Sequence, residues 1–226
     1  MYNFDKANVN IYKIQLCLLW RFTMKIKWYG HACFKIISGN YSVVIDPYSP
    51  NSVPGLSPLR LKADKVLCTH DHHDHNAKDA VELIKNSASP FKYATVKTFH
   101  DEVGGEKRGK NSIYILEAEG LRVAHFGDLG CIPTDEQLNT IGNLDAAMIP
   151  VGGYYTIDAK TAKLILSKLD VKVIIPMHYR NGDVGYGVLD TLDTFESLIT
   201  DRPAFDYGDE IEIAVDTEKQ LAVLNI

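Results

Sequence analysis

The sequence predicts a layered α/β domain. Segments in which apolar and polar residues alternate, as they do in strands, recur along the chain and are separated by segments with helical periodicity. The 226 residues are 46% hydrophobic and 23% charged, so one large domain can bury a sizeable core. Ligand-type polar residues follow several of the expected strands, and layered sheets place their ligand sites at strand ends.

The expected strands and helices follow one another along the whole chain. Alternation and turn signals predict strands at 25–29, 33–38, 41–46, 64–69, 92–98, 112–118, 121–126, 144–151, 171–177, 210–215 and 219–225. Turns are expected at 38–40 and at Glu119-Gly120. Helical periodicity predicts helices at 77–86 with Asn76 as N-cap, at 158–169 with Asp158 as N-cap, and near 190–200.

Residues 1–23 stand apart from the expected single domain of residues 24–226. Met24 begins "MKIKWYGHACF", which has the pattern of a first strand, whereas the apolar stretch at 11–22 is interrupted by charged and amide side chains. Residues 1–23 form either an appendage or an extra amphipathic helix packed on the domain. No small-residue cleavage site follows them, so a secretory signal is not expected.

Composition and charge indicate which cellular compartment and which kinds of partner to expect. The four cysteines are scattered without a CxxC pair, which favours a reducing cytoplasm over a disulfide framework. No apolar span of about twenty residues occurs, so no membrane partner is expected. The net charge of −5 argues against nucleic acid as a partner, although it leaves room for a local basic patch. The oligomeric state stays open, a homo-oligomer included.

The stretch "CTHDHHDHN" at 68–76 places four of the chain's eight histidines in six positions. His70 and His72 are two apart, so in an extended segment or turn their imidazoles can point the same way. Asp74 and His75 are adjacent and should diverge toward a second point. This spacing suits two cations roughly 3.5–4 Å apart better than one. The alternative is a histidine-rich surface loop that binds metal by accident.

Residues far away in the sequence favour the first of these interpretations. His100, Asp128 and His178 each occur where an expected strand ends, and accidental metal binding needs no such partners. Asp46 ends another expected strand, whereas His73 falls between the ligand positions and should point elsewhere. The sequence therefore predicts one site at a common edge.

Several motifs together resemble those of the metallo-β-lactamase superfamily, whose shared signature is HxHxDH. They are "WYGHACFKI", "VVIDPY", "VLCTHDHHDH", "AHFGDLG", "IPVGGYYTIDAKTA" and "VIIPMHY", from about Lys25 toward the C-terminal region. More narrowly, they resemble a branch of metal-dependent hydrolases related to the bacterial ascorbate phosphate lactonase. The resemblance implies a four-layer αββα sandwich with a dinuclear metal site at one edge of its two sheets.

The resemblance also implies the ligands of two divalent cations. The first cation would be held by His70, His72 and His100. The second would be held by Asp74, His75 and His178, with Asp128 bridging both. Histidine-rich ligation without thiolate favours zinc, with manganese or iron as alternatives.

Three further residues are expected around these ligands. Asp46 matches the acidic residue that holds the histidine loop, because metal-bound imidazoles usually donate their second nitrogen to such a group. His125 is expected to support the ligands or the structure, the alternative being contact with substrate. The resemblance places His31 near the site, with the same alternatives.

The charge of such a site indicates the kind of substrate. Two divalent cations, two aspartates and a bridging hydroxide leave a net positive charge, which favours an anionic substrate. The expected activity is hydrolysis of a small anionic ester, lactone or phosphoester by the bridging hydroxide, since metals lower the pKa of bound water to about 7. Asp74 would orient this nucleophile and accept its proton, and Asp128 would bridge the cations.

Five residues in loops are candidates for substrate contact: Lys107, Arg108, Tyr154, Tyr155 and Tyr179. Lys107 and Arg108 lie in the loop 104–111, and the guanidinium fork of the arginine suits phosphate or carboxylate. The alternative is that this loop is a solvated turn. Two of the tyrosines lie in the loop 152–158, before a helix start where an anion could sit, or are ordinary turn residues. The third follows His178 directly and is a candidate for substrate contact or for an acid.

Other functions compete with this hydrolase. A phosphodiesterase or nuclease acting on nucleotides or nucleic acid is one alternative, but the acidic balance and the short chain weigh against it. A drug-hydrolysing β-lactamase is disfavoured because the motifs resemble a different branch. A non-catalytic metal-binding or ligand-binding protein could use the same fold, but every expected ligand position is filled.

Overall fold

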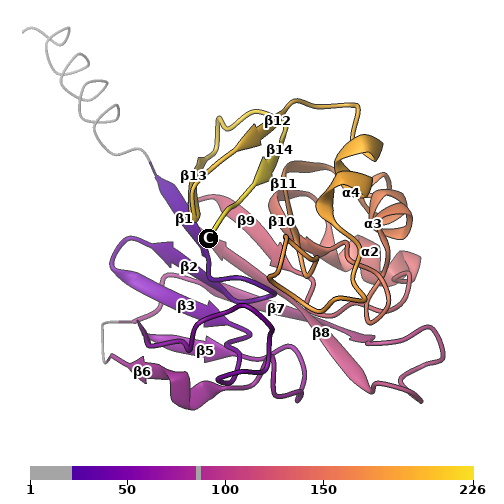
Figure 1. Ribbon diagram of the computed structural model, residues 1–226. Helices are drawn as coiled ribbons and strands as arrows, with labels where there is room; N and C mark the ends of the chain where they lie inside the picture. The colour runs from indigo at the N-terminus through magenta and orange to yellow at the C-terminus, as the bar shows by residue number, and fades with distance from the viewer. Residues whose placement is uncertain (1–21, 85–87) are drawn as a thin grey trace, which may run out of the picture.

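Two β-sheets that share one apolar core form the frame of the protein (Figure 1). A computed structural model describes residues 22–84 and 88–226, so the extension expected at 1–23 lies almost entirely outside the described residues. Helices lie beside the larger sheet, and the α/β sandwich predicted from the sequence is confirmed.

One sheet has five strands in the order β13-β1-β2-β3-β5. Its strands are β1 (Thr23–Trp28), β2 (Phe34–Ser38), β3 (Tyr41–Ile45), β5 (Lys65–Leu67) and β13 (Glu210–Ala214). Neighbouring strands are antiparallel except β3 and β5, which run parallel. This parallel pair brings the segments after Ile45 and after Leu67 to the same edge, and these segments carry Asp46 and the histidine cluster.

The other large sheet has seven strands in the order β12-β14-β11-β10-β9-β8-β7. Its strands are β7 (Lys92–Phe99), β8 (Lys110–Ala118), β9 (Leu121–His125), β10 (Leu144–Pro150), β11 (Val171–Met177), β12 (Ala204–Asp206) and β14 (Gln220–Val223). The neighbouring strands β9, β10, β11, β14 and β12 run parallel to one another. Strand β8 pairs antiparallel with both β9 and β7. The expected turn between β8 and β9 is confirmed, with positive φ angles of 56° and 77° at Glu119 and Gly120.

In the part of the chain that the structure describes, three α-helices lie at the side of the seven-stranded sheet: α2 (Asp135–Ile141), α3 (Ala159–Leu166) and α4 (Leu192–Leu198) (Figure 1). Asp158 caps α3 as predicted, because its carboxylate accepts a hydrogen bond of 2.8 Å from the Thr161 amide. Helix α2 was not among the expected elements, although Thr134 and Gln137 form a reciprocal capping box at its start.

The prediction of a helix at 77–86 is wrong for residues 77–84, the part of this segment that the structure describes. Lys78–Ala80 form a single 3-10 turn, η1, and Val81–Leu83 form the strand β6, which pairs in parallel with β4 (Leu61–Ala63). Strand pairing satisfies the backbone of this segment and buries Val81, so tertiary context overrides the helical pattern. Asn76, the expected N-cap, instead donates a hydrogen bond to Asp71.

The small β4–β6 sheet and its loops, in place of an α-helix, cover the outer face of the five-stranded sheet in the described residues. A separate apolar cluster lies there, made of Cys33, Val44, Tyr48, Val53, Ala63 and Val81. The main core includes apolar residues of both large sheets and of α2, α3 and α4. Within the described ranges, no helix has the length and apolar character needed to cross a membrane.

Candidate metal centre

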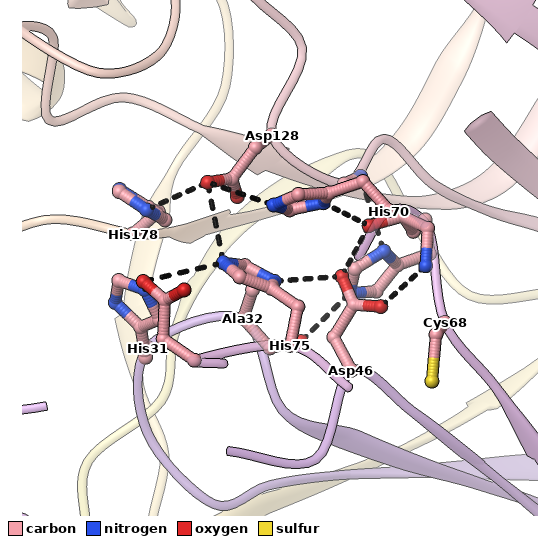
Figure 2. Close-up of polar contacts among 12 residues, drawn as sticks. His31, Ala32, Asp46, Cys68, His70, His75, Asp128 and His178 are labelled. Atoms are coloured by element: carbon pink, nitrogen blue, oxygen red, sulfur yellow. Dashed lines mark hydrogen bonds and ion pairs between the residues drawn. The ribbon is translucent and has the colours of Figure 1, made fainter. Parts of the chain in front are cut away.

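The ends of five strands meet at one edge of the sheets and bring together side chains from distant parts of the sequence. Asp46 follows β3, His70 follows β5, His100 follows β7, Asp128 follows β9 and His178 follows β11. Figure 2 shows four of them around a common centre, with the His75 imidazole between the carboxylates of Asp46 and Asp128. The convergence predicted from the sequence is therefore present in the structure.

The Asp128 carboxylate lies at the middle of the cluster. Its Oδ2 atom is 3.1 Å from His178 Nε2, 3.2 Å from His75 Nε2, 3.3 Å from His100 Nε2 and 3.9 Å from His70 Nε2. The residue is only 2% exposed. A single buried carboxylate oxygen that faces four imidazoles from three segments is the arrangement expected of a ligand shared by two cations.

The donor atoms include two groups of histidine nitrogens, each with members that face this carboxylate. The ligand atoms of His70, His72 and His100 all lie within 4.8 Å of one another, as expected for the first cation. Those of His31, His75 and His178 form a second group under the same limit.

Several of these buried atoms have no hydrogen-bond partner among the described residues. They are His31 Nδ1 and Nε2, His70 Nε2, His75 Nε2, His100 Nδ1, His178 Nδ1 and Asp128 Oδ1. Buried polar atoms without partners are rare in proteins, because each costs about 1–3 kcal/mol. Cations coordinated by His70 Nε2, His75 Nε2 and Asp128 Oδ1 would remove that penalty for these three atoms, so the residues present fit a metal site.

The charge states of the cluster also fit metal binding. Burial lowers the pKa of His70 to about 3 and that of His100 to about 4, so both imidazoles are neutral near pH 7. Neutral imidazole is the form that coordinates a metal. Burial raises the pKa of Asp128, but His178 and His75 outweigh it and hold that pKa well below its usual range. Burial lowers the pKa of His75, but Asp128 and Asp46 outweigh it and raise that pKa well above its usual value. His70 and His100 are therefore neutral nitrogen donors beside an ionised carboxylate, whereas a cation would displace a proton from His75.

Asp46 holds the histidine loop as predicted. Its carboxylate accepts hydrogen bonds from the Thr69 amide at 2.7 Å and from the Thr69 hydroxyl at 2.6 Å. Its Oδ2 atom also lies 3.0 Å from His75 Nδ1, with both residues fully buried. In the neutral form of His75 that donates its Nδ1–H to Asp46, Nε2 carries no proton and faces Asp128, the orientation that a metal ligand needs.

Asp128 is positioned by His125 and by Asn111, of which only His125 was among the expected site residues. His125 Nε2 lies 2.8 Å from the Ala32 carbonyl oxygen, and its Nδ1 accepts a hydrogen bond from the Gly127 amide. Asn111 Oδ1 accepts a hydrogen bond of 3.1 Å from the Asp128 amide. His125 is fully buried and supports the loop that carries Asp128, which agrees with the expected supporting role.

His31 was expected to support the ligands, but the structure places it among the atoms that could themselves bind a cation. Its ring centroid lies 4.0 Å from that of His178, and its Nε2 lies 3.4 Å from Asp74 Oδ2. His31, Asp46 and His178 also have left-handed backbone conformations, with φ of 53°, 52° and 55°. Such conformations are costly for residues other than glycine and are concentrated at functional sites.

A cavity of about 440 Å³ opens above the cluster. Its lining includes Asp128 and Asp74 together with Arg108 and Tyr155, two of the expected substrate contacts. The Arg108 guanidinium lies 5.6 Å from the centre of the Tyr155 ring. The cation and the aromatic ring therefore form one wall of the cavity.

Three lining residues were missed or misplaced by sequence reasoning. They are Ser52, His73 and Tyr186. His73 was expected to point elsewhere but lines the cavity. The Tyr186 hydroxyl lies 2.7 Å from the Ser52 carbonyl oxygen and 3.1 Å from Asp74 Oδ2. Tyr186 follows β11 in an irregular segment, and no motif in the sequence marks it.

The remaining candidates do not line this cavity. Tyr179 is 5% exposed and packs in the main core, with its ring 5.8 Å from that of Trp28. Tyr154 is 65% exposed and contacts Tyr155 edge to face. Lys107 pairs with Glu102 at the surface. The structure therefore brings two of the five candidates, Arg108 and Tyr155, to the cavity.

Comparison with known proteins agrees with the fold and the cluster. The family model described as the beta-lactamase superfamily domain matches residues 25–178. The fold and the site thus define a metallo-β-lactamase superfamily protein, as the motifs predicted. Within this superfamily the chain belongs to the UPF0173 metal-dependent hydrolases, which confirms the predicted class of enzyme.

Curated relatives and solved structures support this assignment. UPF0173 metal-dependent hydrolases from Thermoplasma volcanium and Thermoplasma acidophilum are 30% and 29% identical to this chain. The matches cover 71% of this chain and 86% and 85% of the two relatives. A crystal structure of a metallo-β-lactamase superfamily protein from Thermotoga maritima has a TM-score of 0.70 and 33% identity, over 89% of this chain and 98% of that chain.

Proposed function

We propose that the protein hydrolyses a small anionic ester, lactone or phosphoester with two divalent cations, of which zinc is favoured. The observation that carries this proposal is the position of Asp128 Oδ2, within 3.1–3.9 Å of four imidazole nitrogens at the cavity. For the Thermotoga maritima relative, zinc-dependent hydrolysis has been suggested, which agrees with a nitrogen-rich set of ligands.

The two groups of donors support an assignment of ligands to the two cations. His70, His72 and His100 would hold one, and Asp74, His75 and His178 the other, with Asp128 shared by both. His31, which belongs to the second group of donors, is a further candidate. When bound, divalent cations polarise the bond to be cleaved and generate a hydroxide nucleophile near neutral pH. Asp46 then keeps the His75 imidazole in the tautomer that leaves Nε2 free.

Asp74 is placed to orient a nucleophile beside this cluster. Burial raises its pKa, but the hydrogen bond with His31 and the charge of His75 outweigh burial, so the pKa lies below its usual range. Asp74 is therefore ionised, and its Oδ2 atom, which faces the Tyr186 hydroxyl at 3.1 Å, can orient a nucleophile at the site by accepting a hydrogen bond from it.

Arg108 supports an anionic substrate. Its guanidinium lines the cavity beside Tyr155, and among the described residues it has no carboxylate within ion-pair distance. A guanidinium can bind phosphate or carboxylate with two parallel hydrogen bonds. Arg108 is thus the substrate contact in the proposed function, and the Tyr155 ring restricts how the guanidinium can move.

Metal analysis combined with a substrate screen tests the proposal. The purified chain should bind close to two zinc ions and hydrolyse at least one anionic lactone, carboxylic ester or phosphoester. An Arg108→Ala variant should keep its metal but lose about tenfold or more in kcat/KM for anionic substrates, because one charge-assisted contact is worth about 1.5–3 kcal/mol. Metal content near zero, or no hydrolysis with zinc, manganese or iron, would reject the proposed function.

A further inference from the structure

A second hollow adjoins the metal cavity on the other side of His72 and Arg108. It has a volume of about 650 Å³, and these two residues line both spaces. The candidate ligand His70 also lines the hollow, at the side of the metal cluster. Ser112 and Tyr114 of strand β8 form part of its wall. A molecule bound at the metal cluster can therefore extend past Arg108 into this hollow, which the mechanism proposed above does not use.

The second hollow is cationic in a protein that is acidic as a whole. Its lining contains the four cations Lys78, Lys97, Arg108 and Lys110. Asp71 is the acidic residue of the lining, and its carboxylate already accepts a hydrogen bond of 2.5 Å from the Asn76 amide group. The whole chain has a net charge of −5, so this concentration of positive charge does not follow from composition.

These cations are not neutralised by neighbouring acids. Within the described part of the chain, none of the four has a carboxylate at ion-pair distance. Lys97 donates a hydrogen bond of 3.0 Å to the Ser112 hydroxyl, which holds its ammonium group at the wall. By contrast, Lys25 and Lys219 elsewhere on the surface pair with acids at 2.8 and 2.7 Å.

We propose that this hollow binds a second anionic group, phosphate or carboxylate, of the same substrate. Substrates of the protein would then be small molecules with two anionic groups, one on each side of Arg108. The binding site stands on its own observations, whereas the statement that its ligand is a substrate rests on the proposed function. A long polyanion such as single-stranded RNA is disfavoured because the whole chain has a net charge of −5.

Matched ligands with one or two charges test the hollow in the zinc-loaded full chain. Glutarate and 3-phosphonopropanoate carry two anionic groups, and pentanoate has a similar length but only one. By isothermal titration calorimetry, both dianions should bind about tenfold more tightly than pentanoate, a difference of about 1.4 kcal/mol. The tighter of the two dianions identifies carboxylate or phosphate as the preferred second group.

Charge-neutralising variants locate the effect. In a Lys97→Gln/Lys110→Gln double variant, the affinity for the dianions should fall to about that for pentanoate. Pentanoate binding and zinc content should stay unchanged. A Lys160→Gln/Lys163→Gln variant removes the same charge from the exposed surface of α3 and should keep the preference. Equal binding of monoanion and dianion by the natural chain, or an unchanged preference in the first variant, would overturn the inference.

A measurement without metal separates the hollow from the catalytic cluster. Inorganic phosphate added to the metal-free chain should show ³¹P line broadening that is lost in the Lys97→Gln/Lys110→Gln variant and kept in the α3 variant. Preferential dianion binding without any hydrolysis would reject the proposed function and leave the hollow established. Hydrolysis without preferential dianion binding would support the proposed function and reject the hollow as an anion site. Displacement of glutarate by a single-stranded oligonucleotide at far lower concentration would overturn the assignment to small molecules.

Discussion

Asp46 Oδ2 lies 3.0 Å from His75 Nδ1, and the other nitrogen of the same imidazole lies 3.2 Å from Asp128 Oδ2. The two carboxylates therefore hold one fully buried ring from opposite sides. Asp46 and Asp128 follow strands in different sheets, β3 and β9, so this relationship also connects the two layers at the site. Several predictions about metal binding depend on it.

Replacing Asp46 with asparagine should weaken metal binding without removing any ligand. The amide cannot accept all the hydrogen bonds that Thr69 and His75 now donate, so the His75 ring loses its fixed tautomer. We expect metal affinity, measured by competition with a chromophoric chelator, to fall about 10–100-fold. An Asp64→Asn variant is the control, since Asp64 accepts hydrogen bonds from Ser42 and contacts no imidazole of the cluster. Equal affinities of the natural chain and Asp46→Asn would contradict the role of Asp46.

Replacing Asp128 with asparagine should reduce the binding of both cations together. Its Oδ2 atom faces imidazoles of both donor groups, so loss of the charge removes the ligand that they share. Metal content measured by mass spectrometry should drop well below one ion per chain, and hydrolysis should be lost. Asp71→Asn removes a carboxylate from the same histidine stretch but outside the donor groups, and it should keep its metal. Full metal retention in Asp128→Asn would remove this residue from the site.

Metal binding should stabilise the fold. Buried His70 Nε2, His75 Nε2 and Asp128 Oδ1 lack hydrogen-bond partners among the described residues, and coordination would give them partners. At a free metal concentration of 100 times Kd, linkage predicts about 2.7 kcal/mol of added stability. Differential scanning calorimetry with and without chelator measures this as a rise in Tm with zinc concentration. An unchanged Tm in saturating zinc would count against a preformed metal site.

The loop that carries Arg108 should depend on the ionised Asp101 carboxylate. Asp101 accepts hydrogen bonds from four backbone amides between residues 103 and 108, at 2.7–3.0 Å. Burial raises its pKa, but these four amides outweigh burial and hold the pKa at about 2. We therefore expect Asp101→Asn to lower the free energy of unfolding and to raise KM for anionic substrates more than it changes kcat.

The pH dependence of this effect has a definite sign. The folded pKa of Asp101 lies below the unfolded value of about 3.9, so its stabilisation is complete above that pH and is lost as the pH falls through 2. Urea unfolding of the metal-free chain and of Asp101→Asn should thus differ at pH 6 and converge near pH 2. The exposed Asp183→Asn variant should show no such convergence, and a gap for Asp101→Asn that persists at pH 2 would refute the explanation.

The sequence by itself predicted most of the candidate ligands and determined the class of fold. Histidines and aspartates at HxHxDH spacing, and single ligand residues after β7, β9 and β11, are chemical signals that stand in the chain whatever its packing. Alternating strands also predicted most of both sheets. The order of strands in each sheet, by contrast, depends on contacts between segments far apart in sequence. The sequence therefore predicts that the ligand residues meet at one edge, but the distances between them come only from the tertiary structure.

Tertiary structure alone decided which of the other residues reach the site. Val81 became part of a strand because β4 offered it a pairing partner, although its segment has a helical pattern. Tyr179 follows a ligand directly yet packs against Trp28, whereas Tyr186 lies in an irregular segment and contacts Asp74. Side-chain direction at the end of a strand and the path of a loop are set by packing, so ligand types can be read from the sequence while the cavity wall and the cationic hollow cannot.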